Sequence, residues 1–364
     1  MENLFIGIMS GTSLDGVDAA LCKFETGACE LIATHFLPYP TELKLELLTL
    51  HKPDANELET ALLLGNKLAT LYAEAVNNLL ISAKKSAHDI AATGCHGQTI
   101  RHRPELGFTL QIGNAALLAE LTNITVISDF RSRDIAAGGQ GAPLVPAFHK
   151  AIFASENLNR AIINIGGIAN ITYLTKSGDV LGFDSGPGNM LLDAWTKLKL
   201  GKDYDADGAW AATGVVHESF LNNMLAEPYF ALPPPKSTGR DLFNDDWLKQ
   251  HILYPHCRPQ DIARTLVELS AYTICQALSK HCPEVDEVYL CGGGARNTLL
   301  ASSIKTMLKG TPVLDTDALG VGVDWLEAVA FAWLAKQTLE NKPSNLPAVT
   351  GAKGLRVLGA IYPA

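Results

Sequence analysis

Apolar runs interrupted by a glycine turn occur once in each half of the chain. Near the N-terminus, the runs at 4–9 and 17–21 flank a turn-rich stretch. In the second half, a run at 161–174 is broken only by Gly166-Gly167. Short apolar runs bounded by turn residues are typical of buried strands. The pattern therefore predicts a strand, a glycine turn and a returning strand in both halves.

Segments with a helical period separate further strand-like runs. Residues 57–83 place one apolar face at Leu58, Leu62, Gly65, Ala69, Tyr72, Val76 and Leu79. Other predicted elements are strands near 90–95, 109–112, 124–128, 180–183 and 288–290, and helices after 189 and 297, at 261–281 and at 324–340. This alternation indicates an α/β fold. We read it as two related domains, 1–150 and 151–364.

Composition and charge narrow the function classes. The chain has 364 residues, which corresponds to roughly two domains at about 150 residues each. Apolar residues make up 47% and charged residues 18%, which excludes a disordered protein. The net charge is −9 and no run of Lys or Arg stands out. We therefore expect neither nucleic acid nor an anionic membrane as the main partner. A small anionic molecule stays compatible with this charge.

Cysteine usage and the N-terminal residues indicate a cytoplasmic protein. The seven cysteines are odd in number and form no CxxC pair, which argues against a disulfide framework and a structural zinc site. The first residues, MENLFIGIMSGTSLDG, lack the basic region of a secretory signal. No window of about 18 residues is free of polar side chains, so no membrane span is expected.

Glycine turns at strand ends are the strongest candidates for a ligand site. P-loop, GxGxxG, HRD/DFG, HExxH and GxSxG motifs are all absent. The stretch 10–18 could bind phosphate through backbone N–H groups, or it could be a plain hairpin turn. Its counterpart at Gly166-Gly167 favours a clamp on a triphosphate. Three glycines at 292–294 offer a flat surface for a planar base, whereas close strand–helix packing needs one glycine.

Several charged and polar side chains follow predicted strands. Asp184 ends an apolar strand, where ligand sites of α/β sheets lie, and is a candidate general base or a helix N-cap. Arg131 or Arg133 could bind a carboxylate through two hydrogen bonds, or pair with neighbouring aspartates. His96 is by itself more typical of a structural histidine. Glu327 begins an apolar helix, where glutamate often serves the helix dipole.

Together these motifs resemble the anhydro-N-acetylmuramic acid kinase family. The matching pieces run from end to end in the family's order: MSGTSLDGVD at 9–18, HGQT at 96–99, DFRSRDIAAGGQGAPLVPAFH at 129–149, NIGGIAN at 164–170, GFDSGPGNMLLDAW at 182–195, PPPKSTGR at 233–240, CGGGARN at 291–297 and EAVAFAWLA at 327–335. The least similar stretch is 319–324. The resemblance implies an actin/hexokinase/Hsp70-like ATPase, with two ribonuclease-H-like domains flanking a nucleotide cleft.

The resemblance also implies roles for individual residues. It assigns Asp184 and Glu327 to catalysis, His96, Gln98, Arg131 and Arg133 to the sugar, and Asp15 and Asp18 to Mg²⁺. The implied ATP-binding residues are Gly11, Thr12, Ser13, Leu14, Asp15, Gly16, Val17, Asp18, Gly166, Gly167, Gly292, Gly293, Gly294 and Asn297. A homodimer is expected on the same ground.

The implied reaction is double. ATP would phosphorylate O6 of 1,6-anhydro-N-acetylmuramate while water opens the anhydro bridge at C1, giving N-acetylmuramate 6-phosphate for cell-wall recycling. Asp184 would activate the water, as in an inverting glycosidase. Three alternatives remain: a plain sugar kinase of the same fold, an actin- or Hsp70-like ATPase that acts through partners, and an anhydrosugar hydrolase that ignores ATP.

Overall fold

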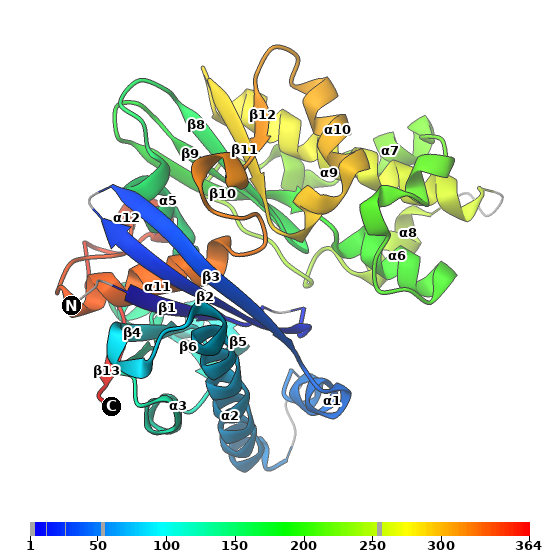
Figure 1. Cartoon of the computed structure of the whole chain (residues 1–364). Helices are drawn as coiled ribbons and strands as arrows, with labels where there is room; N and C mark the ends of the chain where they lie inside the picture. The colour runs from blue at the N-terminus through cyan, green and yellow to red at the C-terminus, as the bar shows by residue number, and fades with distance from the viewer. Residues whose placement is uncertain (1–3, 12, 26, 52–54, 253–256) are drawn as a thin grey trace. The chain divides into compact units, whose positions relative to one another are not determined.

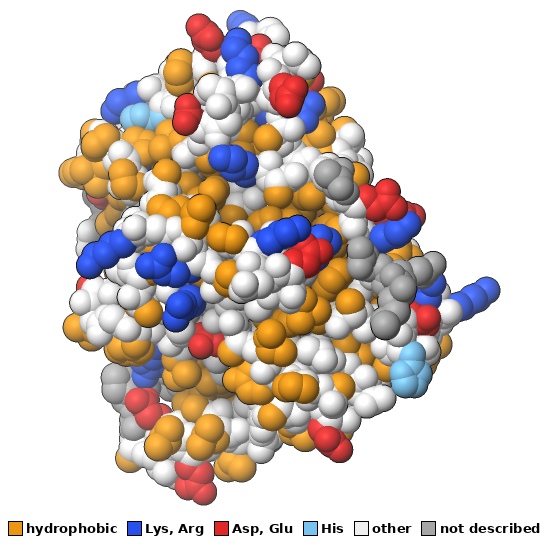
Figure 2. Space-filling model, turned by 90° about the vertical axis from the view of Figure 1, so that its left-hand side faces the viewer, with side chains coloured by type: hydrophobic (Ala, Val, Ile, Leu, Met, Phe, Trp, Pro, Cys, Tyr) orange, Lys and Arg blue, Asp and Glu red, His pale blue; other side chains and the backbone are white. Residues whose placement is uncertain are grey.

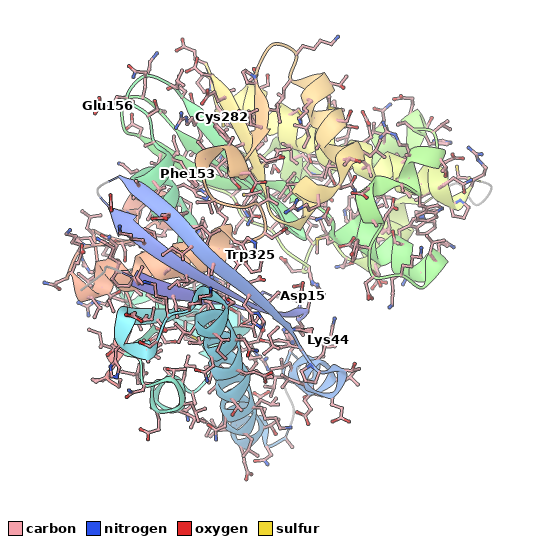
Figure 3. The ribbon with its side chains drawn as sticks, viewed as in Figure 1. Asp15, Lys44, Phe153, Glu156, Cys282 and Trp325 are labelled. Carbon is pink, nitrogen blue, oxygen red and sulfur yellow. The ribbon has the colours of Figure 1, made fainter. Side chains whose placement is uncertain are left out.

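The computed structural model describes residues 4–11, 13–25, 27–51, 55–252 and 257–364. The chain divides into two compact units, one made of Met1–Ile152 with Trp325–Ala364 and one made of Phe153–Asp324. Phe153 and Trp325, labelled in Figure 3, mark the two boundaries. Each unit is described separately below.

The first unit contains a mixed six-stranded sheet in the order β13-β7-β4-β1-β2-β3. Strands β1, β2 and β3 run antiparallel, β1, β4 and β7 run parallel, and β13 is antiparallel to β7. These strands are β1 (Leu4–Met9), β2 (Gly16–Glu25), β3 (Ala28–Pro38), β4 (Ile90–Cys95), β7 (Val126–Ser128) and β13 (Ala360–Tyr362). The helices of this unit are α1 (Thr41–Thr49), α2 (Glu57–Ala83), α3 (Ala115–Thr122), α4 (Ser132–Ala136), α5 (Val145–Phe153), α11 (Leu326–Leu339) and α12 (Pro347–Thr350).

The second unit repeats this strand order without the terminal strand. Its sheet runs β10-β9-β8-β11-β12, with β8, β9 and β10 antiparallel and β8, β11 and β12 parallel (Figure 1). The strands are β8 (Arg160–Ile165), β9 (Ile168–Leu174), β10 (Val180–Pro187), β11 (Glu287–Cys291) and β12 (Val313–Asp315). The helices are α6 (Met190–Leu200), α7 (Glu218–Leu225), α8 (Asp245–His251), α9 (Pro259–His281) and α10 (Thr298–Met307). The predicted α/β class and the repeated strand–turn–strand are thus confirmed.

Helix α11 lies in the first unit, although we expected residues 151–364 to form one domain. Its backbone packs directly on two strand glycines. A Cβ atom at Gly7 of β1 would collide with the carbonyl oxygen of Ala328, and one at Gly94 of β4 would collide with that of Phe331. Close approach of a helix to a sheet at glycine explains why α11 covers this sheet. Glu327 therefore belongs to the first unit and Asp184 to the second.

Each unit has its own hydrophobic core. In the first, α2 and α3 cover the sheet and bury Tyr72, Val76 and Leu118. In the second, α9 supplies the largest share of the core and buries Leu266, Leu269 and Ile274. On the face shown in Figure 2, Lys and Arg side chains are interspersed with hydrophobic and acidic ones. None of the seven cysteines, all of them among the described residues, forms a disulfide.

Candidate active site

The loop between β1 and β2 leaves open space at Gly11. The Leu14 backbone has a left-handed φ of 57°, and its N–H donates to the Gly11 carbonyl at 3.3 Å. A Cβ atom at Gly11 would meet only Ser13, with Oγ at 3.4 Å. Among the described residues, neither packing nor backbone conformation requires glycine at this position, which is compatible with close approach of a ligand. Thr12, also predicted in this site, lies outside the described residues.

Asp15 stabilises the same loop and is exposed. Its Oδ1 accepts hydrogen bonds from Ser13 Oγ at 2.7 Å and from the Gly16 N–H at 3.1 Å (Figure 3 labels Asp15). Gly16 itself is required by packing, because a Cβ atom there would collide with the Leu37 carbonyl and the Phe36 ring. Val17 is buried in β2, and Asp18 follows it, half-buried.

The buried side chain of Gln98 holds the backbone of this loop in place. It is fully buried, its amide donates to the Gly11 carbonyl at 3.0 Å, and its Oε1 accepts from the Tyr39 hydroxyl at 3.3 Å. Ser10 Oγ lies 2.8 Å from the Tyr72 hydroxyl in the same group. Burial raises the pKa of Tyr39 to about 12, so its phenol stays protonated and can donate. In this structure Gln98 holds the loop backbone, and its predicted contact with the sugar stays untested.

The buried side chain of His96 and the half-buried side chain of Arg131 form a pair just after the ends of β4 and β7. Arg131 donates from Nε and Nη2 to Nε2 of His96, at 3.1 and 2.9 Å, and from Nη1 to the Gly141 carbonyl at 2.8 Å. Because Nε2 accepts, His96 is neutral and carries its proton on Nδ1. Burial and the charge of Arg131 hold the pKa of His96 well below its usual value. Nδ1 is buried and makes no regular hydrogen bond among the described residues, although the backbone groups of Ser10 and Gly97 favour its protonated form and partly offset the lowered pKa.

Glu327 joins this pair electrostatically, whereas Arg133 does not. Burial lowers the pKa of Arg131 to about 10, and the negative charge of Glu327 opposes that shift. Glu327 is half-buried in the first turn of α11. Arg133 is exposed on α4, and its side chain makes no hydrogen bond or ion pair within the described part of the chain. The structure thus favours Arg131 over Arg133 as the anion-binding side chain.

In the second unit, the turn between β8 and β9 also offers unfilled space. A Cβ atom at Gly166 would meet only the Ile168 carbonyl at 3.6 Å, and one at Gly167 only Met190 at 3.6 Å. The carbonyl of Gly167 accepts hydrogen bonds from the N–H groups of Gly188 and Met190, at 2.9 and 3.2 Å. The turn is therefore fixed by the start of α6, while its two Cα atoms stay accessible to a ligand.

The three glycines after β11, Gly292, Gly293 and Gly294, lie in three different environments. Gly292 has a φ of +77°, and a Cβ atom there would collide with Asn164. A Cβ atom at Gly294 would collide with the Ile165 side chain, so this glycine permits close packing. At Gly293, no atom of the described residues lies within 4 Å of a Cβ position. Asn297 caps α10, because its Oδ1 accepts from the Leu300 N–H at 3.1 Å. Gly293 is thus the member of this motif that is free to contact a nucleotide.

Asp184 lies at a bulge near the end of β10 and is held by the segment 229–238. Its Oδ2 accepts from the Thr238 N–H at 3.0 Å, its own N–H donates to the Lys236 carbonyl at 3.0 Å, and its carbonyl accepts from the Tyr229 hydroxyl at 2.9 Å. Oδ1 has no hydrogen-bond partner among the described residues. The Thr238 hydroxyl, also buried, has none there either. Of the two carboxylate oxygens of Asp184, only Oδ2 is thus engaged within the described part of the chain.

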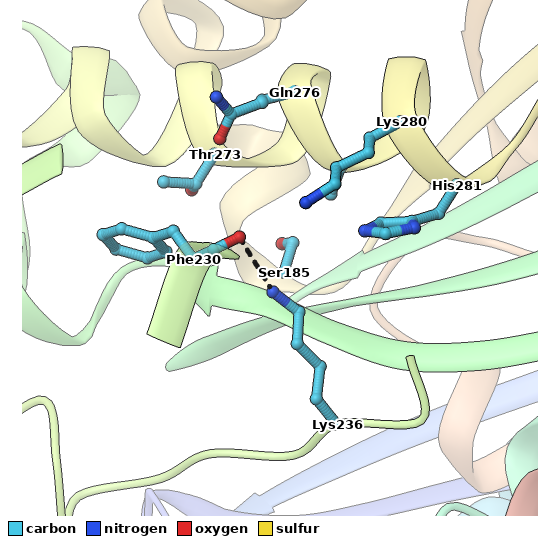
Figure 4. A pocket seen from close by; sticks show the side chains of 8 residues that line it. Ser185, Phe230, Lys236, Thr273, Gln276, Lys280 and His281 are labelled. Atoms are coloured by element: carbon cyan, nitrogen blue, oxygen red, sulfur yellow. Dashed lines mark hydrogen bonds between the residues drawn. The ribbon is translucent and has the colours of Figure 1, made fainter. Parts of the chain in front are cut away.

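Burial raises the pKa of Asp184 to about 6, against the lowering effects of the Thr238 hydrogen bond and the Lys236 charge. Lys236 is fixed in turn by the Phe230 carbonyl at 3.4 Å (Figure 4) and by the Tyr229 carbonyl at 3.2 Å. Its ammonium group also lies over the Tyr229 ring. A small pocket beside it is lined by Ser185, Phe230, Thr273, Gln276, Ala277, Lys280 and His281. A carboxyl group with this pKa is ionised at neutral pH and can accept a proton.

The described residues contain no group of three or more His, Cys, Asp or Glu side chains that could cage a metal ion. Mg²⁺ does not need such a cage, because it keeps several waters and binds through one or two carboxylates together with phosphate oxygens. Oδ2 of Asp15 accepts no hydrogen bond within the described part of the chain, so this exposed carboxylate fits such a site. No helix among the described residues is long and apolar enough to cross a membrane.

Comparison with known proteins identifies the family. The family described as anhydro-N-acetylmuramic acid kinase matches residues 3–364. Proteins of that name from Nitrosospira multiformis and Nitrosomonas europaea are 53% and 54% identical to the chain, over 99% of this chain and 99% of each relative. Component A of the (R)-2-hydroxyglutaryl-CoA dehydratase of Acidaminococcus fermentans has a TM-score of 0.48 at 14% identity, covering 91% of this chain and 96% of that one. This structural similarity is weak, whereas the sequence matches extend over the full length of the chain. The chain therefore belongs to the anhydro-N-acetylmuramic acid kinase family.

Proposed function

We propose that the chain transfers the γ-phosphoryl group of ATP to O6 of 1,6-anhydro-N-acetylmuramate while water opens the anhydro bridge at C1. The observation that carries this proposal is the family match over residues 3–364. The geometry supports the proposal, since the half-buried carboxylate of Asp184 lies near the end of β10 and its Oδ1 accepts no hydrogen bond from the described residues. The product would be N-acetylmuramate 6-phosphate, together with ADP.

Asp184 would act as the general base. Thr238 fixes Oδ2, which leaves Oδ1 to accept a proton from the attacking water. The water oxygen forms a bond to C1 while the C1–O6 bond breaks. O6 then bonds to the γ-phosphorus, and the bond between that phosphorus and the β,γ-bridging oxygen breaks. Water attacks opposite to O6, as in an inverting glycosidase, and Glu327 is a second candidate carboxylate.

The nucleotide would be held by glycines whose Cβ positions are empty, namely Gly11, Gly166, Gly167 and Gly293. Asp15, with Asp18 two residues into β2, would hold Mg²⁺ through water. When bound, Mg²⁺ supplies positive charge that stabilises the transferring phosphoryl group. The shared strand order of the two sheets supports the inference that both units are ribonuclease-H-like and that the fold is that of the actin-like ATPases.

Arg131 is proposed to bind the lactyl carboxylate of the sugar. Replacing it with alanine removes a charge-assisted pair, so we expect a loss of about 1.5–3 kcal/mol in sugar binding, or about 10- to 150-fold in KM. Arg133→Ala is the matched control and should leave the KM almost unchanged, because that side chain is exposed on α4. Steady-state kinetics with varied sugar would measure both. An unchanged KM in Arg131→Ala would mean that other groups hold the carboxylate.

The charge of Lys236 should set the acid limb of the pH–rate profile. With a base whose pKa is about 6, kcat should fall as the pH drops below that value. Lys236 lowers this pKa, so Lys236→Met should raise it and move the acid limb to higher pH. Lys236→Arg keeps the charge and should stay close to wild type. The dependence of kcat on pH between about pH 5 and 8 measures this shift. An identical acid limb in all three proteins would mean that the charge of Lys236 does not influence the pKa of the catalytic base.

A cytoplasmic location and a homodimer stay predictions, as does the lack of a nucleic-acid partner. The oligomeric state can be read from sedimentation equilibrium of the full chain, with a mass of two chains expected. The proposed activity is tested by incubating the protein with the anhydro sugar, with and without Mg-ATP. We expect a phosphorylated, ring-opened sugar only with ATP. Ring opening without ATP would indicate a hydrolase, and phosphorylation of free N-acetylmuramate alone a plain sugar kinase.

A further inference from the structure

Asp134 on α4 is a fully buried carboxylate that is held only by neutral donors. Its Oδ2 accepts from the Gly141 N–H at 2.8 Å, and its Oδ1 accepts from Asn345 Nδ2 and from the Thr350 hydroxyl, both at 2.8 Å. No ion pair with Lys or Arg is present among the described residues. Burying a carboxylate is costly unless donors surround it. Three donors therefore fix the position of the Asp134 carboxylate, and any residue bonded to the same network is fixed with it.

Two of these donors come from the C-terminal segment, which runs alongside the loop 137–141. Backbone bonds join the same two stretches: the Gln140 N–H donates to the Thr350 carbonyl at 2.7 Å, and the Lys353 N–H to the Ala137 carbonyl at 2.9 Å. The loop is therefore attached at both ends to residues more than two hundred positions later in the sequence. Asn345 is itself fixed, since its Oδ1 accepts from the Arg356 N–H at 2.7 Å.

Gly141 connects this network to Arg131. Its N–H is bound by Asp134, and its carbonyl accepts from Arg131 Nη1 at 2.8 Å. Gly141 has a φ of +68°, and a Cβ atom there would lie 2.8 Å from Ile135, so the peptide has little freedom to rotate. A shift of Asp134 would move the Gly141 peptide and with it one of the two supports of the guanidinium, the other being His96.

We propose that Asp134, held by Asn345 and Thr350, is a positioning residue that orients Arg131 for the carboxylate of the sugar. With three N–H groups of Arg131 bound to His96 and Gly141, two of the five stay without a partner among the described residues. These two lie on the terminal nitrogens, the pair that binds a carboxylate bidentately. The C-terminal segment thereby contributes to sugar selectivity. This inference rests on the proposed function.

The test separates a positioning role from a merely structural one by a double-mutant cycle. Thr350→Val removes one donor to Asp134 and Thr350→Ser retains it. We expect Thr350→Val to raise the KM for the sugar about 3- to 10-fold, with the KM for ATP unchanged and Thr350→Ser close to wild type. Asp134→Asn replaces an acceptor oxygen by a donor and should raise the sugar KM further.

Measuring Thr350→Val in the Arg131→Ala protein tests the positioning role separately from the proposed carboxylate contact. If Thr350 acts through Arg131, Thr350→Val should add nothing to the sugar KM of Arg131→Ala. Equal effects of Thr350→Val with and without Arg131, or equal rises in the KM for ATP and sugar, would overturn the positioning role. An unchanged sugar KM in Arg131→Ala alone would instead refute the proposed carboxylate contact. Circular dichroism and unfolding temperatures establish that each variant is folded.

Discussion

Asp184→Asn should bind ATP and the anhydro sugar normally and lose at least about 10²-fold in kcat. Asparagine keeps the size of the side chain, and its oxygen can still accept from the Thr238 N–H. It cannot take a proton from water. O6 becomes an acceptor for the phosphoryl group only as its bond to C1 breaks, so phosphorylation should fall by the same factor as ring opening. Both rates are measured in one assay, by following ADP and the opened sugar.

Asp193→Asn is the matched control for this experiment. Asp193 is also half-buried, on α6, and burial raises its pKa to about 7. It is the fourth residue of α6, six positions after the last residue of β10, and we expect its replacement to reduce kcat less than about tenfold. Phosphoryl transfer at the wild-type rate without ring opening in Asp184→Asn would disprove the coupled mechanism. If both rates persist, Asp184 serves only the local structure, and Glu327 becomes the first alternative base.

Gly293→Val should abolish ATP binding while leaving the second unit folded. No atom of the described residues lies within 4 Å of a Cβ atom at this position, so we expect the larger side chain to obstruct a nucleotide rather than the fold. Gly11→Val should act in the same way on the phosphate-binding side, since only Ser13 is near its Cβ. Calorimetric titration with ATP and thermal unfolding of both variants give affinity and stability independently.

The neighbouring glycine provides the control. Gly294→Ala places a methyl group against the Ile165 side chain and should lower the unfolding temperature by several degrees, because overpacking costs about 1–3 kcal/mol. Gly293→Val should show the opposite combination, with unchanged stability and lost affinity. Wild-type affinity for ATP in folded Gly293→Val would remove this turn from the nucleotide site.

The local pattern of apolar and polar residues predicted much of the fold. The paired strands around the two glycine turns, the strands β4 and β11 and the helices α2 and α9 all lie where their periods place them. The long strand β3 was not predicted, because it is half-exposed and lacks a continuous apolar run. The place of α11 could not be read from its own sequence. Its contacts are the glycines of β1 and β4, and a glycine inside a strand carries no local sign of the helix that will cover it.

The candidate site shows the same division between local and long-range information. The place of Asp184 after an apolar strand made it a candidate, but its partners Tyr229, Lys236 and Thr238 lie more than forty positions later in the sequence, where no local pattern connects them to it. Asn297 could have been recognised as a cap, since asparagine directly before an amphipathic helix is a strong N-cap signal. Gln98 donates to the Gly11 carbonyl because folding brings the start of β5 (Gln98–Arg103) next to the β1–β2 loop, which no local spacing indicates.

The central claim is that one water molecule opens the bridge at C1 while ATP phosphorylates O6. A single incubation of the protein with 1,6-anhydro-N-acetylmuramate, Mg-ATP and ¹⁸O-water tests it. Immediate reduction with borohydride fixes the oxygen at C1 before it can exchange, and mass spectrometry of the fragments locates the label. The account predicts one ¹⁸O atom at C1, none at O6 and none in the phosphoryl group. Label at O6 or in the phosphoryl group, or a phosphorylated sugar whose anhydro bridge is intact, would contradict it.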